Sequence, residues 1–162
     1  MASLLETLGE LIGSNWKHRE VARRHSRTFV CRCGTHIFFR NSLCLTCQAP
    51  LGYLPGEARL VALDPGPQPG TWVGEGVRAP QKCCGNRELP ARCNWMLAAD
   101  DPNPRCIACR LNRTIPNIDD ADNARYWGLI ELAMRRLVSE LLALGLPVTS
   151  KVDEDEEGGL MF

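Results

Sequence analysis

The sequence predicts an α+β protein: small cysteine-bearing β-modules are followed by a long C-terminal amphipathic helix and preceded by a short N-terminal helix. Three observations predict it. Eight of the nine cysteines fall into two closely spaced sets. Short apolar runs separated by turn residues fill residues 28–63, which is typical of short β-strands. Residues 119–147 carry apolar side chains at helical spacing between a helix start signal and a helix stop signal.

The N-terminal helix is expected over residues 3–13, where five apolar residues recur at helical spacing before Gly13. These residues are Leu4, Leu5, Leu8, Leu11 and Ile12. An isolated helix of this length is marginal in water and needs a packing partner. We therefore expect it to pack on its own domain, on a second copy of the chain or on a protein partner.

A basic arm follows this helix and ends at residue 27. Residues 1–50 carry seven basic and three acidic residues, whereas residues 151–162 carry one basic and five acidic residues. Cations gathered in one arm can neutralise phosphates, so nucleic-acid binding is an alternative function. The candidate residues are Lys17, Arg19, Arg23, Arg24 and Arg27.

The first cysteine set consists of two tight pairs joined by a ten-residue connector. Its members are Cys31, Cys33, Cys44 and Cys47. Two such pairs supply four sulfur ligands at about 2.3 Å around one ion, the usual tetrahedral arrangement of structural zinc.

The second set is more loosely spaced, and its candidate ligands are Cys84, Cys93, Cys106 and Cys109. Cys83 competes with Cys84 for the fourth place. We prefer Cys84 because Gly85 follows it as Gly34 follows Cys33, and glycine lets the backbone turn close to a ligand sulfur. Two structural Zn²⁺ ions per chain are thus expected.

Disulfides and iron are the alternatives to zinc. Disulfides fit poorly, because no basic and apolar secretory leader opens the sequence and the cysteine number is odd. A cytoplasmic location is therefore expected. Four thiolates also suit iron, but the pair spacing differs from that of ferredoxins. No run of 18 apolar residues occurs, so no membrane span is expected.

A Pro/Gly-rich segment separates the two cysteine sets and resembles a linker in composition. Near the C-terminus, Asp119, Asp120 and Asp122 cluster at a helix start, and Gly145 and Pro147 mark its end. The predicted division is an N-terminal extension 1–27, a first zinc module 28–63, a linker 64–80, a second zinc module 81–118, a helix 119–147 and an acidic tail 148–162.

Several strings together resemble the family of zinc-binding metallopeptidases that carry an N-terminal zinc-ribbon domain. The strings are FVCRCG (29–34), IFFRN (37–41), LGY (51–53), CGN (84–86), CNW (93–95), CIACRLNRTIP (106–116), RRL (135–137) and LGLP (144–147). The resemblance covers about residue 28 to the C-terminus and favours Cys84 over Cys83 as the ligand. It implies zinc-ribbon modules ahead of a peptidase domain with an H-E-x-x-H helix.

That catalytic motif does not occur in this chain, whose histidines are His18, His25 and His36. No catalytic residue is therefore carried over. The sequence predicts a non-catalytic zinc-binding protein that serves in interaction or substrate recognition. Two alternatives remain: a nucleic-acid-binding zinc ribbon, and a fragment of or partner to an active metallopeptidase.

Overall fold

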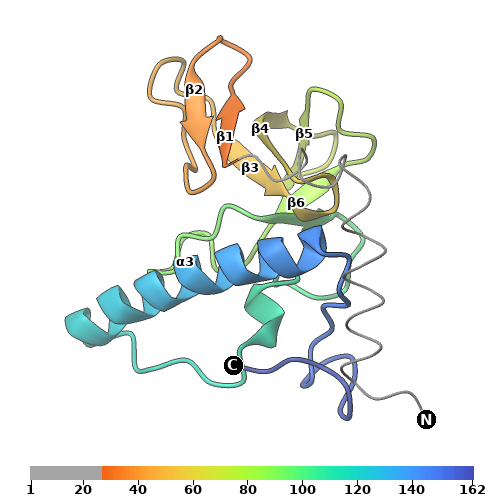
Figure 1. Ribbon diagram of the computed structural model, residues 1–162. Helices are drawn as coiled ribbons and strands as arrows, with labels where there is room; N and C mark the ends of the chain where they lie inside the picture. Colours follow the sequence, from red (N-terminus) through yellow and green to blue (C-terminus); the bar gives the residue numbers. More distant parts are fainter. Residues whose placement is uncertain (1–26) are drawn as a thin grey trace.

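The computed structural model describes residues 27–162, which form two antiparallel sheets and one long helix (Figure 1). The elements are β1 (Thr28–Val30), β2 (His36–Phe38), β3 (Leu51–Leu54), η1 (Pro55–Glu57), β4 (Arg59–Pro65), β5 (Thr71–Gly74), β6 (Gln81–Cys83), β7 (Met96–Ala98), η2 (Cys109–Leu111) and α3 (Ala121–Ala143).

Within both sheets the described strands pair with antiparallel neighbours, and an isolated parallel bridge joins Tyr53 of β3 to Trp95. β1 and β2 form a two-stranded sheet, and β3 to β7 form a five-stranded sheet in sequence order. In Figure 1, α3 runs across the molecule with the small sheet above it, while η2 and the C-terminus lie below it.

The expected α+β class is wrong, because the described part of the chain is mostly β. Seven strands in two sheets stand against a single α-helix within residues 27–162. The difference arises after the first cysteine set, where β5, β6 and β7 extend the sheet begun by β3 and β4. The N-terminal helix expected over residues 3–13 lies outside the described residues.

Residues 64–80, whose composition resembles a linker, contain the end of β4 and all of β5. Asp64 pairs with Val73, and Pro65 pairs with Trp72. Gly70, with φ +78°, takes the left-handed conformation in the loop between them, which glycine adopts without steric cost. Proline and glycine here form a hairpin turn. The division of the chain into six segments stays a prediction.

An aromatic cluster joins the first module to the large sheet and to α3. The ring centroids of Phe39 and Tyr53 lie 4.8 Å apart, and those of Tyr53 and Trp95 lie 5.1 Å apart. Tyr53 also lies against the helix, with its hydroxyl 3.3 Å from the Ser139 hydroxyl. Six of the eight candidate ligand cysteines belong to the same core cluster of buried residues.

The buried Asn94 side chain ties the two cysteine modules together. Its Nδ2 donates to the carbonyl oxygens of Phe39 at 2.7 Å and Asn41 at 2.9 Å. Asn94 follows the candidate ligand Cys93 directly, and its two acceptors belong to the connector of the first set. Both modules therefore share one core.

α3 begins and ends as its sequence signals indicate. The Asp120 carboxylate accepts hydrogen bonds from the backbone N–H groups of Asp122 and Asn123, which caps the first turn. Gly145, with φ +68°, ends the helix in the left-handed conformation. The helix buries Trp127, Glu131, Met134, Arg135 and Val138.

Candidate metal centres

The first candidate centre joins two sharp backbone turns, one after β1 and one after the return from β2. In the first turn Gly34 donates its N–H to the Cys31 carbonyl at 2.8 Å and adopts φ +84°. In the second turn Gln48 donates its N–H to the Cys44 carbonyl at 2.9 Å. Both turns direct their cysteine side chains inward.

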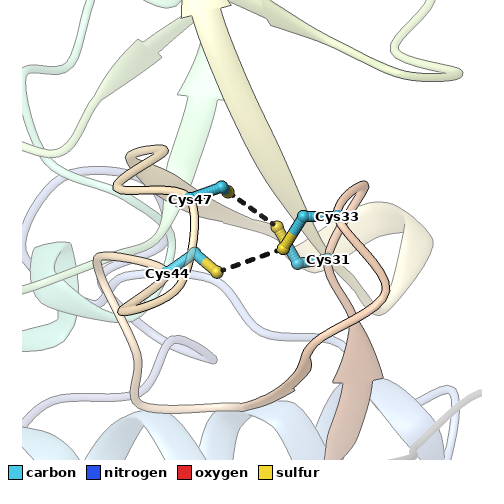
Figure 2. Close-up of side chains that lie close together, drawn as sticks. All are labelled: Cys31, Cys33, Cys44 and Cys47. Atoms are coloured by element: carbon cyan, nitrogen blue, oxygen red, sulfur yellow. Dashed lines mark hydrogen bonds between the residues drawn. The ribbon is translucent and has the colours of Figure 1, made fainter.

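The four sulfur atoms of this centre face one another (Figure 2). The Sγ atoms of Cys31 and Cys47 lie 3.7 Å apart, as do those of Cys33 and Cys44. A tetrahedron with metal–sulfur bonds of about 2.3 Å has edges of about 3.8 Å, whereas a disulfide needs an S–S distance of about 2.05 Å. The spacing therefore fits zinc.

The electrostatics of this cluster show why it needs a cation. Burial raises the pKa of Cys31 to about 12. A hydrogen bond with the Thr35 hydroxyl lowers the pKa of Cys33 to about 6. Four thiolates placed this close together would also repel one another without a counter-charge. A divalent cation allows all four sulfurs to bind as thiolates.

The second candidate centre lies deeper in the protein. Its four sulfur atoms fall within 4.8 Å of one another, and the Sγ atoms of Cys93 and Cys106 lie 3.7 Å apart. All four cysteines are buried, whereas Cys33 and Cys47 of the first centre are exposed. The cysteines that this cluster brings together are Cys84, Cys93, Cys106 and Cys109, the four candidate ligands.

Backbone hydrogen bonds shape this second centre. The Cys106 N–H donates to the Cys84 sulfur at 3.4 Å, and the neighbouring thiols lower the pKa of Cys84 by hydrogen bonding. Gly85 donates its N–H to the Pro104 carbonyl at 2.8 Å, and a Cβ at Gly85 would lie only 3.2 Å from that oxygen. This close approach leaves little room for a side chain, which explains why position 85 is a glycine.

Cys84, and not Cys83, contributes to the second centre. Cys83 ends β6, pairs with Met96 of β7 and packs against the small cluster of Leu54, Leu63 and Met96. Successive side chains of a strand point to opposite faces, so only one of the two neighbours reaches the cluster. Burial raises the pKa of the Cys83 thiol and makes it a poor nucleophile.

A buried carboxylate beside the second centre is the feature that sequence reasoning missed. Glu131 of α3 is 1% exposed, and its Oε2 accepts from the Cys109 thiol at 3.5 Å. Its Oε1 accepts from Asn112 Nδ2 at 2.7 Å. The Arg135 guanidinium lies 4.0 Å away, and both charged side chains are buried. The i,i+4 spacing of Glu131 and Arg135 predicts that the two side chains form an ion pair, but it does not predict that the pair is buried.

Two of the arginines beside the cysteines bind carboxylates. Arg32 pairs with Asp64 at 2.6 Å, and Arg110 pairs with Asp101 and Glu154, each at 2.8 Å. The pair between Arg110 and Glu154 holds the acidic C-terminal segment against the second centre.

The basic arm is described only at its last residue. Arg27 forms an ion pair with Glu140 of α3. The other four candidate residues for nucleic-acid binding, Lys17, Arg19, Arg23 and Arg24, lie outside the described residues.

Both donor sets fit zinc. Four sulfurs at tetrahedral spacing are the usual ligands of a structural zinc ion. Within residues 27–162, only these two groups of Cys, His, Asp or Glu side chains lie close enough together to hold a metal ion. Over the same residues, no helix is both long enough and apolar enough to cross a membrane.

Known proteins resemble this chain in sequence. An uncharacterised protein from Mycobacterium bovis is 31% identical over 137 residues, which cover 84% of this chain and 36% of the relative. Uncharacterised proteins from two strains of Mycobacterium tuberculosis match to the same extent. The chain thus spans about 36% of the length of these curated relatives. No solved structure matches it.

The zinc-ribbon domain family matches residues 28–120, which contain all eight ligand cysteines and both sheets. The expected cofactors are confirmed, because two four-cysteine clusters in such a domain fit two structural Zn²⁺ ions. With more than half of its residues matched and both clusters inside the match, the chain belongs to the zinc-ribbon domain family.

Proposed function

We propose that the protein is a non-catalytic zinc-binding module that acts in protein interaction or substrate recognition. One observation carries the proposal: each centre brings four sulfur ligands together. Four protein ligands complete the tetrahedral shell of zinc and leave no position for water or substrate. Such a centre stabilises the fold and does not activate a nucleophile.

Exposed apolar side chains on the first module support a role in interaction. Val30 and Phe38 are 61% and 54% exposed. They share the outer face of the β1–β2 sheet, because Phe29 and Ile37 alternate with them and pack inward. Leu45, between two ligand cysteines, is 81% exposed. Rigid apolar groups held by a metal-braced turn suit contact with another protein.

Selection from a displayed peptide library tests this proposal. The wild-type protein should enrich peptides whose affinity falls about tenfold or more in the Phe38→Asp/Leu45→Asp double variant, since apolar anchors dominate interface energy. Leu129→Asp, which changes an exposed leucine of α3, is the matched control. Peptides that bind the wild type and the double variant equally would contradict a recognition role for this surface.

A hydrolysis assay tests the non-catalytic part of the proposal. The purified protein with both zinc ions bound should leave an unstructured substrate such as casein intact. Zinc-dependent cleavage that remains after further purification would contradict a purely structural role for the metal.

A second candidate function follows from the length of the relatives. The chain spans about 36% of the length of these relatives, and the metallopeptidase resemblance offers a peptidase role for the rest of such a relative. The test is to assay a full-length relative from Mycobacterium for casein hydrolysis. Activity in the relative would support a substrate-recognition role here, and inactivity would count against the peptidase link.

A cytoplasmic location also belongs to this proposal, because none of the nine cysteines forms a disulfide and reducing compartments keep cysteines in that state. Nucleic-acid binding has less support, since Arg27 is engaged by Glu140.

A further inference from the structure

The outward face of α3 carries an apolar stripe that the described chain does not cover. We define the outer stripe as Tyr126, Ile130, Ala133 and Leu137, which follow one another at spacings of four, three and four residues. Their side chains share one side of the helix. Tyr126, Ile130 and Leu137 are 54%, 61% and 45% exposed. The helical spacing of apolar residues predicts a buried stripe that includes Ile130 and Leu137, but the structure exposes these two and buries Trp127, Met134 and Val138.

The chain that precedes the described residues enters beside this stripe. Glu140, three residues after Leu137, continues the same side of the helix, and it pairs with Arg27. Arg27 is the first described residue, so 26 residues lead up to this point. This ion pair is the only one between the basic arm and α3 among the described residues, and it places the C-terminal end of the arm next to the outer stripe.

The upstream segment has a matching pattern and length. Leu4, Leu8 and Leu11 are spaced by four and three residues, as are the first three residues of the outer stripe. As a helix, residues 3–13 would be about 16 Å long, and the stripe from Tyr126 to Leu137 also extends over about 16 Å. The residues between 13 and 27 can span roughly 45 Å, which exceeds the ~21 Å from Glu140 back to Tyr126.

We propose that residues 3–13 of the same chain pack as a helix along the outer stripe of α3. The covalent connection through the residues between 13 and 27 favours residues 3–13 over a second copy of the protein as the segment that covers the stripe. A stable dimer interface involves roughly 20–30 residues from each partner, and the stripe offers four. A tethered segment has an effective concentration in the millimolar range, so a short helix with few contacts remains docked.

Site-specific photo-crosslinking of the full chain tests the contact. With benzoylphenylalanine in place of Ala133, irradiation should join position 133 to residues 3–13. In a mixture of ¹⁴N- and ¹⁵N-labelled protein, crosslinked peptides should come from a single chain. Crosslinks only between chains would overturn the proposal in favour of a second copy. A lack of crosslinks to residues 3–13 would overturn it outright.

Hydrogen exchange with matched variants supplies an independent readout. Leu137→Asp and Leu8→Asp should each speed amide exchange in residues 3–13 by about tenfold or more, because a buried carboxylate disfavours the docked state. Leu45→Asp makes the same chemical change at a remote exposed site and should leave exchange there unchanged. All three variants should retain two zinc ions, which excludes global unfolding. Equal exchange in Leu137→Asp and the wild type would contradict docking on this stripe.

Discussion

Cys83 and Cys84 are adjacent in the chain, but only Cys84 faces a metal centre. The reason is local: Cys83 is the last residue of β6 and points into the small apolar cluster beside Met96. Its neighbour points the other way, toward Cys93, Cys106 and Cys109. Because successive side chains of a strand point to opposite faces, only one of the two sulfurs reaches the centre. The structure shows this because it places the end of β6 at Cys83.

Serine substitutions at these two positions should have different effects. Cys84→Ser removes one ligand of the second centre, so the zinc content should fall from two ions per chain to one and the unfolding temperature should drop sharply. Cys83→Ser should retain both ions and cost about 1 kcal/mol, the usual scale for a small buried change. Elemental analysis and thermal unfolding measure these outcomes. Equal zinc loss in the two variants would contradict the assignment of Cys84.

The pair of Glu131 and Arg135 is the second residue-level feature with a testable consequence. Both side chains are buried, and Arg135 Nη1 has no hydrogen-bond partner among the described residues. Removing one charge of a buried pair leaves the other uncompensated. Glu131→Gln should therefore lower the free energy of unfolding by about 3 kcal/mol, as should Arg135→Met.

The double variant Glu131→Gln/Arg135→Met should lose less than the sum of the two single losses, because neither charge is then left alone. Urea denaturation with zinc present measures all four proteins of the cycle. Additive losses would show that the two charges do not interact.

At the scale of elements, the sequence predicts those with strong local signals. The pattern of apolar and turn residues indicated strands at β1 to β4, and the cap and stop signals placed the long helix within a few residues of α3. By contrast, β5, β6 and β7 were missed, although they are as long as β1, β2 and β3. Their pairing depends on neighbours brought together by the chain and by the second centre, so it has little local signal.

The cap of α3 provides a prediction at this scale. Asp120→Ala removes the carboxylate that accepts from the N–H groups of Asp122 and Asn123, and it should cost about 1 kcal/mol of stability. Asp119→Ala is the matched control. The hydrogen bond seen at Asp119 is donated by its backbone N–H, which the substitution retains. Equal losses in the two variants, measured by urea denaturation, would indicate a general charge effect and no specific cap.

For the whole molecule, the spacing of cysteines predicted which sulfurs meet but not how deeply they lie. In the second centre every ligand is buried, whereas Cys33 and Cys47 expose the first centre to solvent. Burial depends on packing between distant segments, such as α3 against the aromatic cluster around Tyr53. The sequence signals for the two centres look alike because ligand spacing reports local turns only.

This difference in burial should separate the two zinc ions in a chelation experiment. With excess chelator and a colorimetric zinc indicator, one ion should leave quickly from the first centre and one slowly from the second. Acidification should speed both phases, because protons compete with zinc for thiolates and affinity falls as pH falls.

Cys33→Ser should abolish the fast phase and retain the slow one. A single phase that releases both ions in the wild-type protein would show that the difference in exposure has no effect on zinc release.

The side chain of Asn94 has a consequence for any attempt to dissect this protein. Its amide reaches from beside a ligand of one zinc ion to the backbone around the other. If the first module were excised, the Phe39 carbonyl and the Phe39 ring would face water. If the second module were excised, the Asn94 side-chain amide would lose both of its acceptors. Neither module can therefore be transplanted alone without losing these contacts, and the two form one structural unit.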